Sequence, residues 1–382
     1  MAALSVGADC HPVVSTSTST CTPIAAGPLT SGGTDEDGSI LVVDDTVYFA
    51  WISRRNGDTD VYMESSDDNG ETWSAPWIAV SMTPAPGQTR SDDYVQSLSL
   101  DLDGRIRLSG TRSPDVNGSQ LYTTASTDPH HFPEPVAITS TTGDKVTITP
   151  IRQDASGVYH LIYAWRQGGT GDYRLVQQTS SDAVTWTDPV PLFSPTGYQD
   201  VLPAIELDAT GTLWLIWVRI YSDKPDELFG TPQGDFSNSY LGDLTDIYIS
   251  SSTDGVTFSS PLHLSQKGAG SPPEDQTVAN RSIDTIPALV QGPSGLYATW
   301  VTTAILTASG GASTLMWRVD ELCEPSQIRS LTMGGYSVRG ATLPSGATMI
   351  ASVDETASGQ TTIYNDQYEI ICSDADLGRA AQ

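Results

Sequence analysis

The stretch SDDNGETW at residues 66–73 decides the fold. In its pattern S-x-D-x-G-x-T-W, Asp, Ser and Thr side chains satisfy turn amides, Gly permits positive φ, and the aromatic fills the gap between strands. Shortened relatives, STDPHHF, SSDAVTW and STDGVTF, begin at residues 126, 180 and 252. Each therefore predicts a tight turn between antiparallel strands, and we expect their aspartates to be structural rather than catalytic: Asp68, Asp128, Asp182 and Asp254.

A longer repeat surrounds these turns. A hairpin pattern occurs as ILVVDDTVYFAW, SLSLDLDGRIRLSG, PIRQDASGVYHLIYAW, AIELDATGTLWLIW, ALVQGPSGLYATW and ATLPSGATMIAS. A third strand follows each copy, ending with TTIYND in the last, and most copies continue to a fourth. Repeated four-stranded units are typical of propeller blades, whereas a two-sheet sandwich requires no repeated unit. The sequence therefore predicts an all-β, six-bladed β-propeller with four-stranded antiparallel blades.

The repeat also sets the expected domain boundaries. Residues 1–35 form a Ser/Thr-rich N-terminal segment that we expect to complete the last blade, residues 36–373 form the propeller, and residues 374–382 form a polar tail. A chain of 382 residues fits one such unit, because blades share a single central axis.

Composition excludes several classes of partner. The chain has 18 basic and 46 acidic residues, for a formal charge of −28, which disfavours nucleic acid and anionic membranes. No apolar run reaches the ~18 residues of a membrane span. The five His residues are scattered, so we expect no catalytic metal and no cofactor. A structural calcium ion in the acidic stretch TDEDG, residues 34–38, stays open.

Four cysteines lie near the chain ends: Cys10, Cys21, Cys323 and Cys372. They suit disulfides that tie down the termini of a closed ring. Cys10 with Cys21 is the simplest pairing, but all three connectivities and four free thiols stay open. Together with the Ser/Thr-rich start, this cysteine usage favours an extracellular or periplasmic location, although the N-terminus shows no signal peptide.

The strand order indicates where a site lies. Antiparallel hairpins place the start of each first strand and the end of each second strand at the same mouth of the channel, opposite the Asp turns. Counting back along the first strands places four polar residues there: Asp93, Asp200, Asp284 and Tyr336. The ends of the second strands add arginines: Arg54, Arg55, Arg112, Arg166 and Arg219.

Two interpretations of this mouth stay open. These groups form a polar pocket, or they pair with one another to satisfy strand ends. A long insertion at residues 221–243 follows a second strand and overhangs the same mouth. It is expected to act as a lid or a sugar-stacking wall, or else to be a surface excursion.

The motif at residues 66–73 is called an Asp box, and from about residue 37 to 372 the chain resembles the sialidase superfamily. In blade one, RRNGDTDVYMESSDDNGETWSAP resembles the stretch with the acid/base residue, which implies Asp58, with Asp60 close by. GYSVRGATLPSG is similar to the nucleophile strand, which implies Tyr336 as nucleophile, and Asp200 lies near the place of its carboxylate partner. A tyrosine activated by a carboxylate is the nucleophile such retaining chemistry needs.

The resemblance also implies an arginine clamp for an anionic sugar, since guanidinium groups bind carboxylates in a bidentate manner. IELDATGTLWLIWVR ends in Arg219, which matches one clamp residue, and Arg281 matches another. The first clamp arginine is missing, because the chain reads DGSILVV at its place. DTIPALV echoes that element but carries Thr285 in the Arg position.

The incomplete clamp leaves the expected function divided. The first hypothesis is a glycan-recognising propeller that is non-catalytic or has altered chemistry and binds carbohydrate at the mouth opposite the Asp boxes. The alternative is a sialidase-like exo-glycosidase, and a third hypothesis is a structural or adhesive protein-binding module. Whether the chain is an enzyme therefore stays open at this level. The expected substrate-binding residues are Arg219, Arg281, Arg54, Arg166, Asp93 and Asp284, beside catalytic Tyr336, Asp58 and Asp200.

Overall fold

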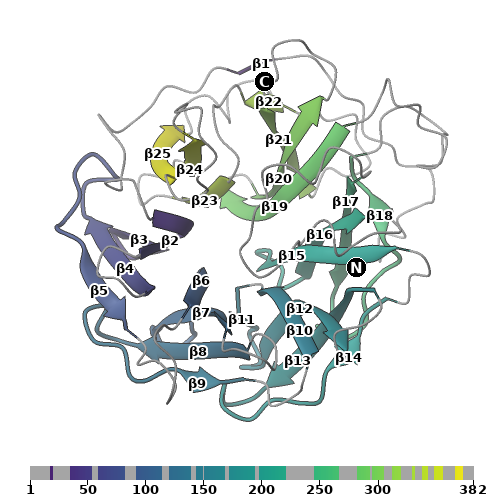
Figure 1. Cartoon of the computed structure of the whole chain (residues 1–382), viewed down its shortest axis with the longest axis horizontal. Coiled ribbons are helices and arrows are strands. Elements are labelled where there is room, and N and C mark those ends of the chain that lie inside the picture. Colours follow the sequence, from purple (N-terminus) through teal and green to yellow (C-terminus); the bar gives the residue numbers. More distant parts are fainter. Residues whose placement is uncertain are drawn as a thin grey trace.

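The computed structural model describes residues 18–19, 35–53, 59–81, 92–113, 120–138, 143–148, 150–167, 172–193, 198–220, 245–265, 282–292, 295–304, 312–319, 329–331, 338–342, 348–355 and 366–372. These residues form an all-β propeller whose units follow one another around a centre in chain order (Figure 1).

Four units are antiparallel blades of four strands in chain order. The first contains β2 (Asp35–Val43), β3 (Thr46–Ser53), β4 (Asp60–Ser66) and β5 (Trp77–Val80). The second contains β6 (Asp92–Leu100), β7 (Ile106–Ser113), β8 (Gln120–Ser126) and β9 (Val136–Ala137). Another contains β15 (Gln199–Leu207), β16 (Leu213–Ile220), β17 (Thr245–Ser252) and β18 (Leu262–His263). The next contains β19 (Ser282–Gly292), β20 (Gly295–Ala304), β21 (Ala312–Arg318) and β22 (Arg329–Leu331).

The remaining strands correct the expectation of six equal four-stranded blades. One unit has five strands: β10 (Gly143–Ile148), β11 (Arg152–Gln153), β12 (Tyr159–Gln167), β13 (Arg174–Ser180) and β14 (Val190–Pro191). Its inner strand is split beside Pro150, and proline has no N–H to donate to the ladder. The last unit has three strands within the described part of the chain: β23 (Val338–Thr342), β24 (Thr348–Glu355) and β25 (Asp366–Cys372).

Two local expectations also change. The strand that pairs with β24 in the last unit is β25, whereas TTIYND lies outside the described residues except for Asp366, and residues 35–38 of the acidic stretch belong to the inner strand β2. From the N-terminal segment, β1 (Thr18–Ser19) pairs in parallel with β22, at the outer edge of the β19–β22 unit.

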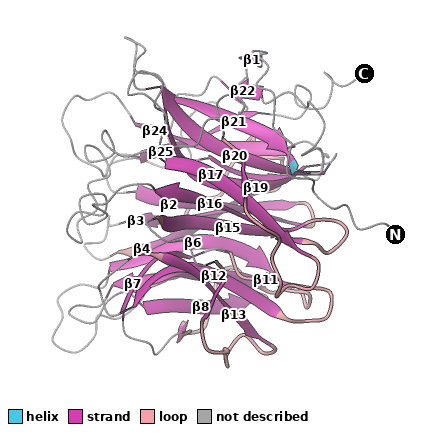
Figure 2. Cartoon of the chain, turned by 90° about the vertical axis from the view of Figure 1, so that its right-hand side faces the viewer, coloured by secondary structure: helices cyan, strands magenta, loops and turns pink. Residues whose placement is uncertain are grey.

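The inner strands close a ring. β2, β6, β10, β15, β19 and β23 contact one another in this order, and β23 contacts β2 again (Figure 1). Viewed from the side, most strands run across the picture in roughly one direction (Figure 2). Polar links tie neighbouring inner strands, for example Ser39 Oγ, which accepts the Leu98 N–H at 2.9 Å. Arg152 likewise binds Glu206 in a bidentate manner at 2.8 and 2.6 Å.

Tryptophan side chains fill the core at equivalent places in three blades. Between two register pairs, each inner strand there has two residues opposite one residue of the second strand, which is the geometry of a β-bulge. The single residues opposite these bulges are Trp51, Trp217 and Trp300, all essentially buried. The bulge therefore makes room for a large aromatic ring between blades, just inside the mouth of the channel.

No helix in the described part of the chain is long and apolar enough to cross a membrane.

Candidate functional site

At one end of the blades, the Asp turns are held by their own side chains. Asp68 Oδ1 accepts the Ser66 hydroxyl at 2.7 Å and the Thr72 N–H at 2.8 Å, and Ser66 Oγ accepts the Gly70 N–H at 2.8 Å. These hydrogen bonds, led by the Thr72 hydroxyl, lower the pKa of Asp68 to about 2. The carboxylate is thus fully engaged in the turn.

The shortened turns use the same scheme. Asp182 accepts the Val184 and Thr185 N–H groups at 2.8 and 2.7 Å, and these bonds lower its pKa to about 2. Asp254 accepts the equivalent amides of its own turn, and its pKa is also lowered. Asp128 accepts the His130 N–H at 2.9 Å and also contacts the His131 ring. The expected structural role of all four aspartates is confirmed.

One of these turns locks two blades together. The Gln177 side chain donates to the Gly255 carbonyl at 2.7 Å and lies 3.3 Å from Nδ1 of His160. His160 is buried, and its Nε2 lies 2.9 Å from Asp154. Gly255 has a φ of +71° and packs directly against the His160 ring. The turn of one blade is therefore seated on the preceding blade.

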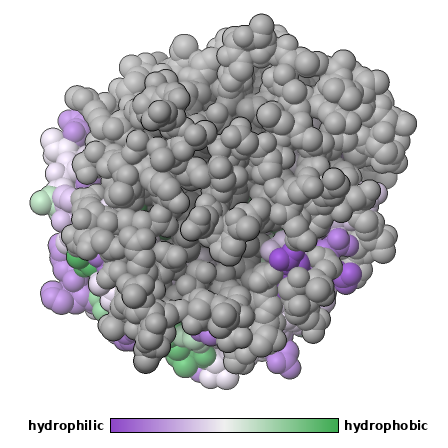
Figure 3. All heavy atoms as spheres, viewed as in Figure 1, coloured by the Kyte–Doolittle hydropathy of each residue, from purple (hydrophilic) through white to green (hydrophobic). Residues whose placement is uncertain are grey.

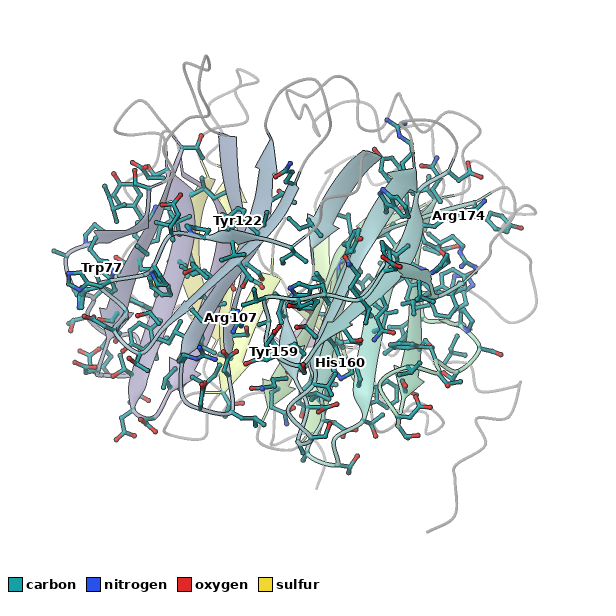
Figure 4. The ribbon with its side chains drawn as sticks, turned by 90° about the horizontal axis from the view of Figure 1, so that it is seen from below. Trp77, Arg107, Tyr122, Tyr159, His160 and Arg174 are labelled. Atoms are coloured by element: carbon teal, nitrogen blue, oxygen red, sulfur yellow. The ribbon has the colours of Figure 1, made fainter. Side chains whose placement is uncertain are left out.

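A buried ion pair lies toward the same end. Arg107 binds both oxygens of Asp101, at 2.9 and 2.6 Å, and its guanidinium lies 4.9 Å from the centre of the Tyr159 ring. Figure 4 shows Arg107, Tyr159 and His160 near this end of the strands, with Arg174 toward the other. Both charges of this pair are satisfied inside the protein, so it is a structural contact between two units.

At the opposite end, the strand registers align carboxylates with arginines. Three directly opposed pairs of residues recur there, each joining an inner strand to the second strand of its unit: Asp93 with Arg112, Asp144 with Arg166, and Asp200 with Arg219. Asp284 occupies the same place in β19, but its partner is Thr302. In three consecutive units, an aspartate position is therefore opposed to an arginine position at the strand end opposite the Asp turns.

In the pair formed by Asp200 of β15 and Arg219 of β16, the side chains form a bidentate ion pair. Arg219 donates from Nε to Asp200 Oδ1 at 2.7 Å and from Nη2 to Oδ2 at 2.9 Å. Trp217 Nε1 donates to the same Oδ1 at 3.0 Å. The Asp200 side chain is 1% exposed, against 12% for Arg219. The carboxylate is therefore inside the blade, while the Arg219 side chain keeps a small exposed area.

Aromatic rings surround this guanidinium. The centre of the Tyr248 ring lies 4.4 Å from Cζ of Arg219, and that of Tyr198 lies 5.6 Å from it. Tyr248 also stacks on Trp217 at 5.8 Å and on His263 at 4.8 Å. Cationic and aromatic groups at these distances attract each other, which fixes the orientation of the arginine plane.

The neighbouring unit supplies a second arginine with similar surroundings. Cζ of Arg166 lies 4.9 Å from the centre of the Tyr173 ring, and the Tyr173 carbonyl accepts the Asp200 N–H at 3.1 Å. Asp144 is the register partner of Arg166. Counting back from the end of the inner strand does not reach it, so the sequence analysis does not name it among the site residues. The hairpin order of GDKVTI and YHLIYAW was the only sequence signal that could have found it.

Other expected site residues lie outside the described residues: Tyr336, Asp58, Arg54, Arg55, Arg281, the insertion at 221–243, and Cys10, Cys21 and Cys323. Asp60 starts β4 at the mouth end and is buried. Within the described ranges, no group of three or more His, Cys, Asp or Glu side chains is placed to hold a metal ion.

Among the described residues, the exposed large apolar side chains are scattered over the surface. They lie in turns, in outer strands and at the end of the inner strand β6: Ile78, Leu100, Leu102, Val136, Val184, Val190 and Val256. In Figure 3 the hydrophobic patches are small and lie among hydrophilic ones near the edge of the visible face. Isolated exposed apolar residues of this kind are normal for a protein surface.

No family model matches the sequence, and no curated protein matches it either. Solved structures do match its fold. The α-L-arabinanase of Penicillium chrysogenum, complexed with arabinobiose, has a TM-score of 0.60 at 13% identity, over 93% of this chain and 98% of that one. The GH93 α-L-arabinofuranosidase of Fusarium graminearum, also complexed with arabinobiose, has a TM-score of 0.58 at 14% identity, over 92% and 96%.

A leech intramolecular trans-sialidase, complexed with 2,7-anhydro-Neu5Ac, has a TM-score of 0.58 at 12% identity, over 94% of this chain and 70% of that one. These structural matches establish the fold. Because the sequence identities are so low, the chemistry of the site has to be argued from its own residues. The chain is a divergent example of the sialidase-like β-propeller fold.

Proposed function

We propose that this protein binds a carbohydrate at the mouth opposite the Asp turns. The observation that carries the proposal is the arginine and tyrosine arrangement around Arg219. Its guanidinium is fixed by Asp200 and lies near the rings of Tyr198 and Tyr248, and the Arg219 side chain is 12% exposed. Sugars combine apolar ring faces with hydroxyl groups, so fixed aromatic and polar side chains at one place suit them.

The fold comparison supports this proposal. Two of the matching propellers were solved with arabinobiose bound, and both are covered over nearly their whole length.

We also propose that the ring of inner strands makes the β10–β14 and β23–β25 units further blades of one six-bladed propeller. A closed ring leaves two mouths, and the Asp turns occupy only one of them.

Within this site, we propose that Asp200 positions Arg219. Both of its oxygens accept hydrogen bonds from Arg219, and Oδ1 also accepts one from Trp217. A carboxylate that is 1% exposed and engaged in this way holds a neighbour in place. It does not itself reach a ligand. The two interpretations of this mouth, a polar pocket and mutual pairing, are thus compatible at this pair, because Arg219 is paired and its side chain is still 12% exposed.

Calorimetric titration with neutral oligosaccharides, beginning with arabinobiose, tests the proposed function. Tyr198→Ala removes a ring beside Arg219 and is expected to weaken binding about threefold to tenfold, the value of one stacked aromatic contact. Tyr48→Ala is the control, since Tyr48 is half-buried at the Asp-turn end of β3. Equal effects of the two substitutions, or failure of every sugar on a broad glycan array to bind, would overturn the proposal.

A second candidate is an exo-glycosidase that uses the same mouth. The two arabinobiose complexes favour it, because both of those propellers are named as arabinan-degrading enzymes. Tyr336 as nucleophile and Asp58 as acid/base remain proposals from the sequence. Hydrolysis of a panel of aryl glycosides, measured beside Tyr336→Phe and Asp58→Asn, separates catalysis from binding. Turnover that either substitution abolishes would establish the enzyme, while sugar binding without turnover of any glycoside would refute it.

Location stays a prediction from the sequence. The Ser/Thr-rich start and the cysteines favour an extracellular or periplasmic protein, which is where a secreted glycan-binding propeller would meet its ligand.

A further inference from the structure

The aspartate and arginine registers at the mouth carry an inference about the class of sugar. In β15 and β16 the opposed residues Asp200 and Arg219 form a bidentate ion pair. In antiparallel sheets, directly opposed residues present their side chains to the same face at about 5 Å between Cβ atoms. The registers also place position 93 opposite 112 and position 144 opposite 166 in the two preceding units.

At these positions the negative charges outnumber the positive ones. The inner strands place aspartates at Asp35, Asp93, Asp144, Asp200 and Asp284, and the second strands oppose them with Ser53, Arg112, Arg166, Arg219 and Thr302. Five aspartates therefore stand against three arginines at this level of the channel. The chain as a whole also carries a formal charge of −28, so the surrounding field is negative as well.

We infer that each of these arginines is neutralised by its opposed aspartate, so that the mouth takes neutral, hydroxyl-rich sugars and rejects carboxylated ones. This inference rests on the proposed function and adds the substrate class to it. A guanidinium already bound to a carboxylate in a bidentate manner has given up the edge that a sugar carboxylate would need.

A single substitution tests this inference, because it is expected to create binding of a carboxylated sugar. Asp144→Asn removes the opposed carboxylate and leaves Arg166 with its full charge beside Tyr173. The variant is expected to bind glucuronate about tenfold or more tightly than the wild-type protein, since a charge-assisted pair with an arginine exceeds one factor of ten. Asp144→Glu keeps the charge and is expected to behave like the wild type.

Asp188→Asn is the matched control. It makes the same change in net charge, but Asp188 is exposed beyond the Asp turn of the same unit, at the opposite end of β13. Titration calorimetry with arabinobiose and with glucuronate at one ionic strength then compares wild type and variants. The expected result is arabinobiose binding without glucuronate binding in the wild type, and glucuronate binding in Asp144→Asn alone.

The possible results separate the two proposals. If the wild type binds glucuronate at least as well as arabinobiose, the neutral-sugar inference fails while carbohydrate binding survives. If the wild type binds no sugar but Asp144→Asn gains glucuronate binding, the charge pairing is upheld and the proposed function fails. If Asp144→Asn gains no more than Asp188→Asn, the pairing at residues 144 and 166 is refuted.

Discussion

Gly255 offers the sharpest test of how the blades are held together. A Cβ added there would lie 3.0 Å from Nε2 of His160 and closer still to Cε1. The ring cannot move away freely, because it is buried and its Nε2 lies 2.9 Å from Asp154. Gly255→Ala therefore forces either the turn or the histidine out of place.

The expected loss follows from two contributions. A φ of +71° costs an alanine roughly 1 to 2 kcal/mol, and overpacking a buried contact costs about 1 to 3 kcal/mol. Together they predict that Gly255→Ala lowers the free energy of unfolding by about 2 to 5 kcal/mol. Urea unfolding at pH 7, followed by tryptophan fluorescence, measures this change, with the m-value reporting whether compactness is altered.

Ala183 provides the matched control from the chain itself. It takes the equivalent place in the turn of the preceding unit, with a φ of 58°, and is buried. In Ala183→Gly, relief of backbone strain opposes the loss of a buried methyl group and the added freedom of the unfolded chain. The stability of this variant should stay within about 1 kcal/mol of the wild type. A loss below about 1 kcal/mol for Gly255→Ala, or equal losses for both variants, would refute the packing argument.

Three further outcomes are expected. Arg219→Met leaves the buried Asp200 without its counter-charge and should cost about 3 to 5 kcal/mol, whereas the double variant with Asp200→Asn should cost clearly less than the sum of the single changes; additive losses in a double-mutant cycle would contradict the coupling. The pKa of Asp182 is lowered to about 2 in the folded protein, so its contribution is present above the ordinary Asp value and is lost as pH falls from about 4 to 2; an Asp182→Asn variant should show a weaker fall of melting temperature in that range, and an unchanged acid profile would count against it. Trp77 Nε1 donates to the Pro129 carbonyl at 2.8 Å, so Trp77→Phe should lower stability by about 1 kcal/mol in urea unfolding, and a neutral result would show that this link between the first two blades contributes nothing.

Local patterns explain what could be predicted. The Asp turns can be predicted from the eight-residue motif at 66–73 and its shortened relatives, because their hydrogen bonds join residues within a few positions of one another. The alignment of Asp93, Asp200 and Asp284 followed from hairpin counting, because antiparallel register is set by the turn.

Contacts between blades explain which features could not be predicted from the sequence. The contact of Gly255 with His160 joins a turn of one unit to a strand of another, and no local pattern marks it. Asp144 escaped the count because the inner strand of its unit is interrupted beside Pro150, which shifts every residue before the break. The Asp200 N–H donates to the backbone carbonyl of Tyr173 in the neighbouring unit, a contact that no single repeat contains.

The outer strands of the blades have a consequence for the protein in concentrated solution. β9, β14 and β18 each contain two residues, and β5 contains four. A sheet edge this short presents too few unpaired N–H and C=O groups to template another chain, although the blades behind it are rich in β structure. The outer edges of these four units therefore resist edge-to-edge polymerisation by geometry, and the mutual repulsion of highly acidic molecules reinforces that resistance.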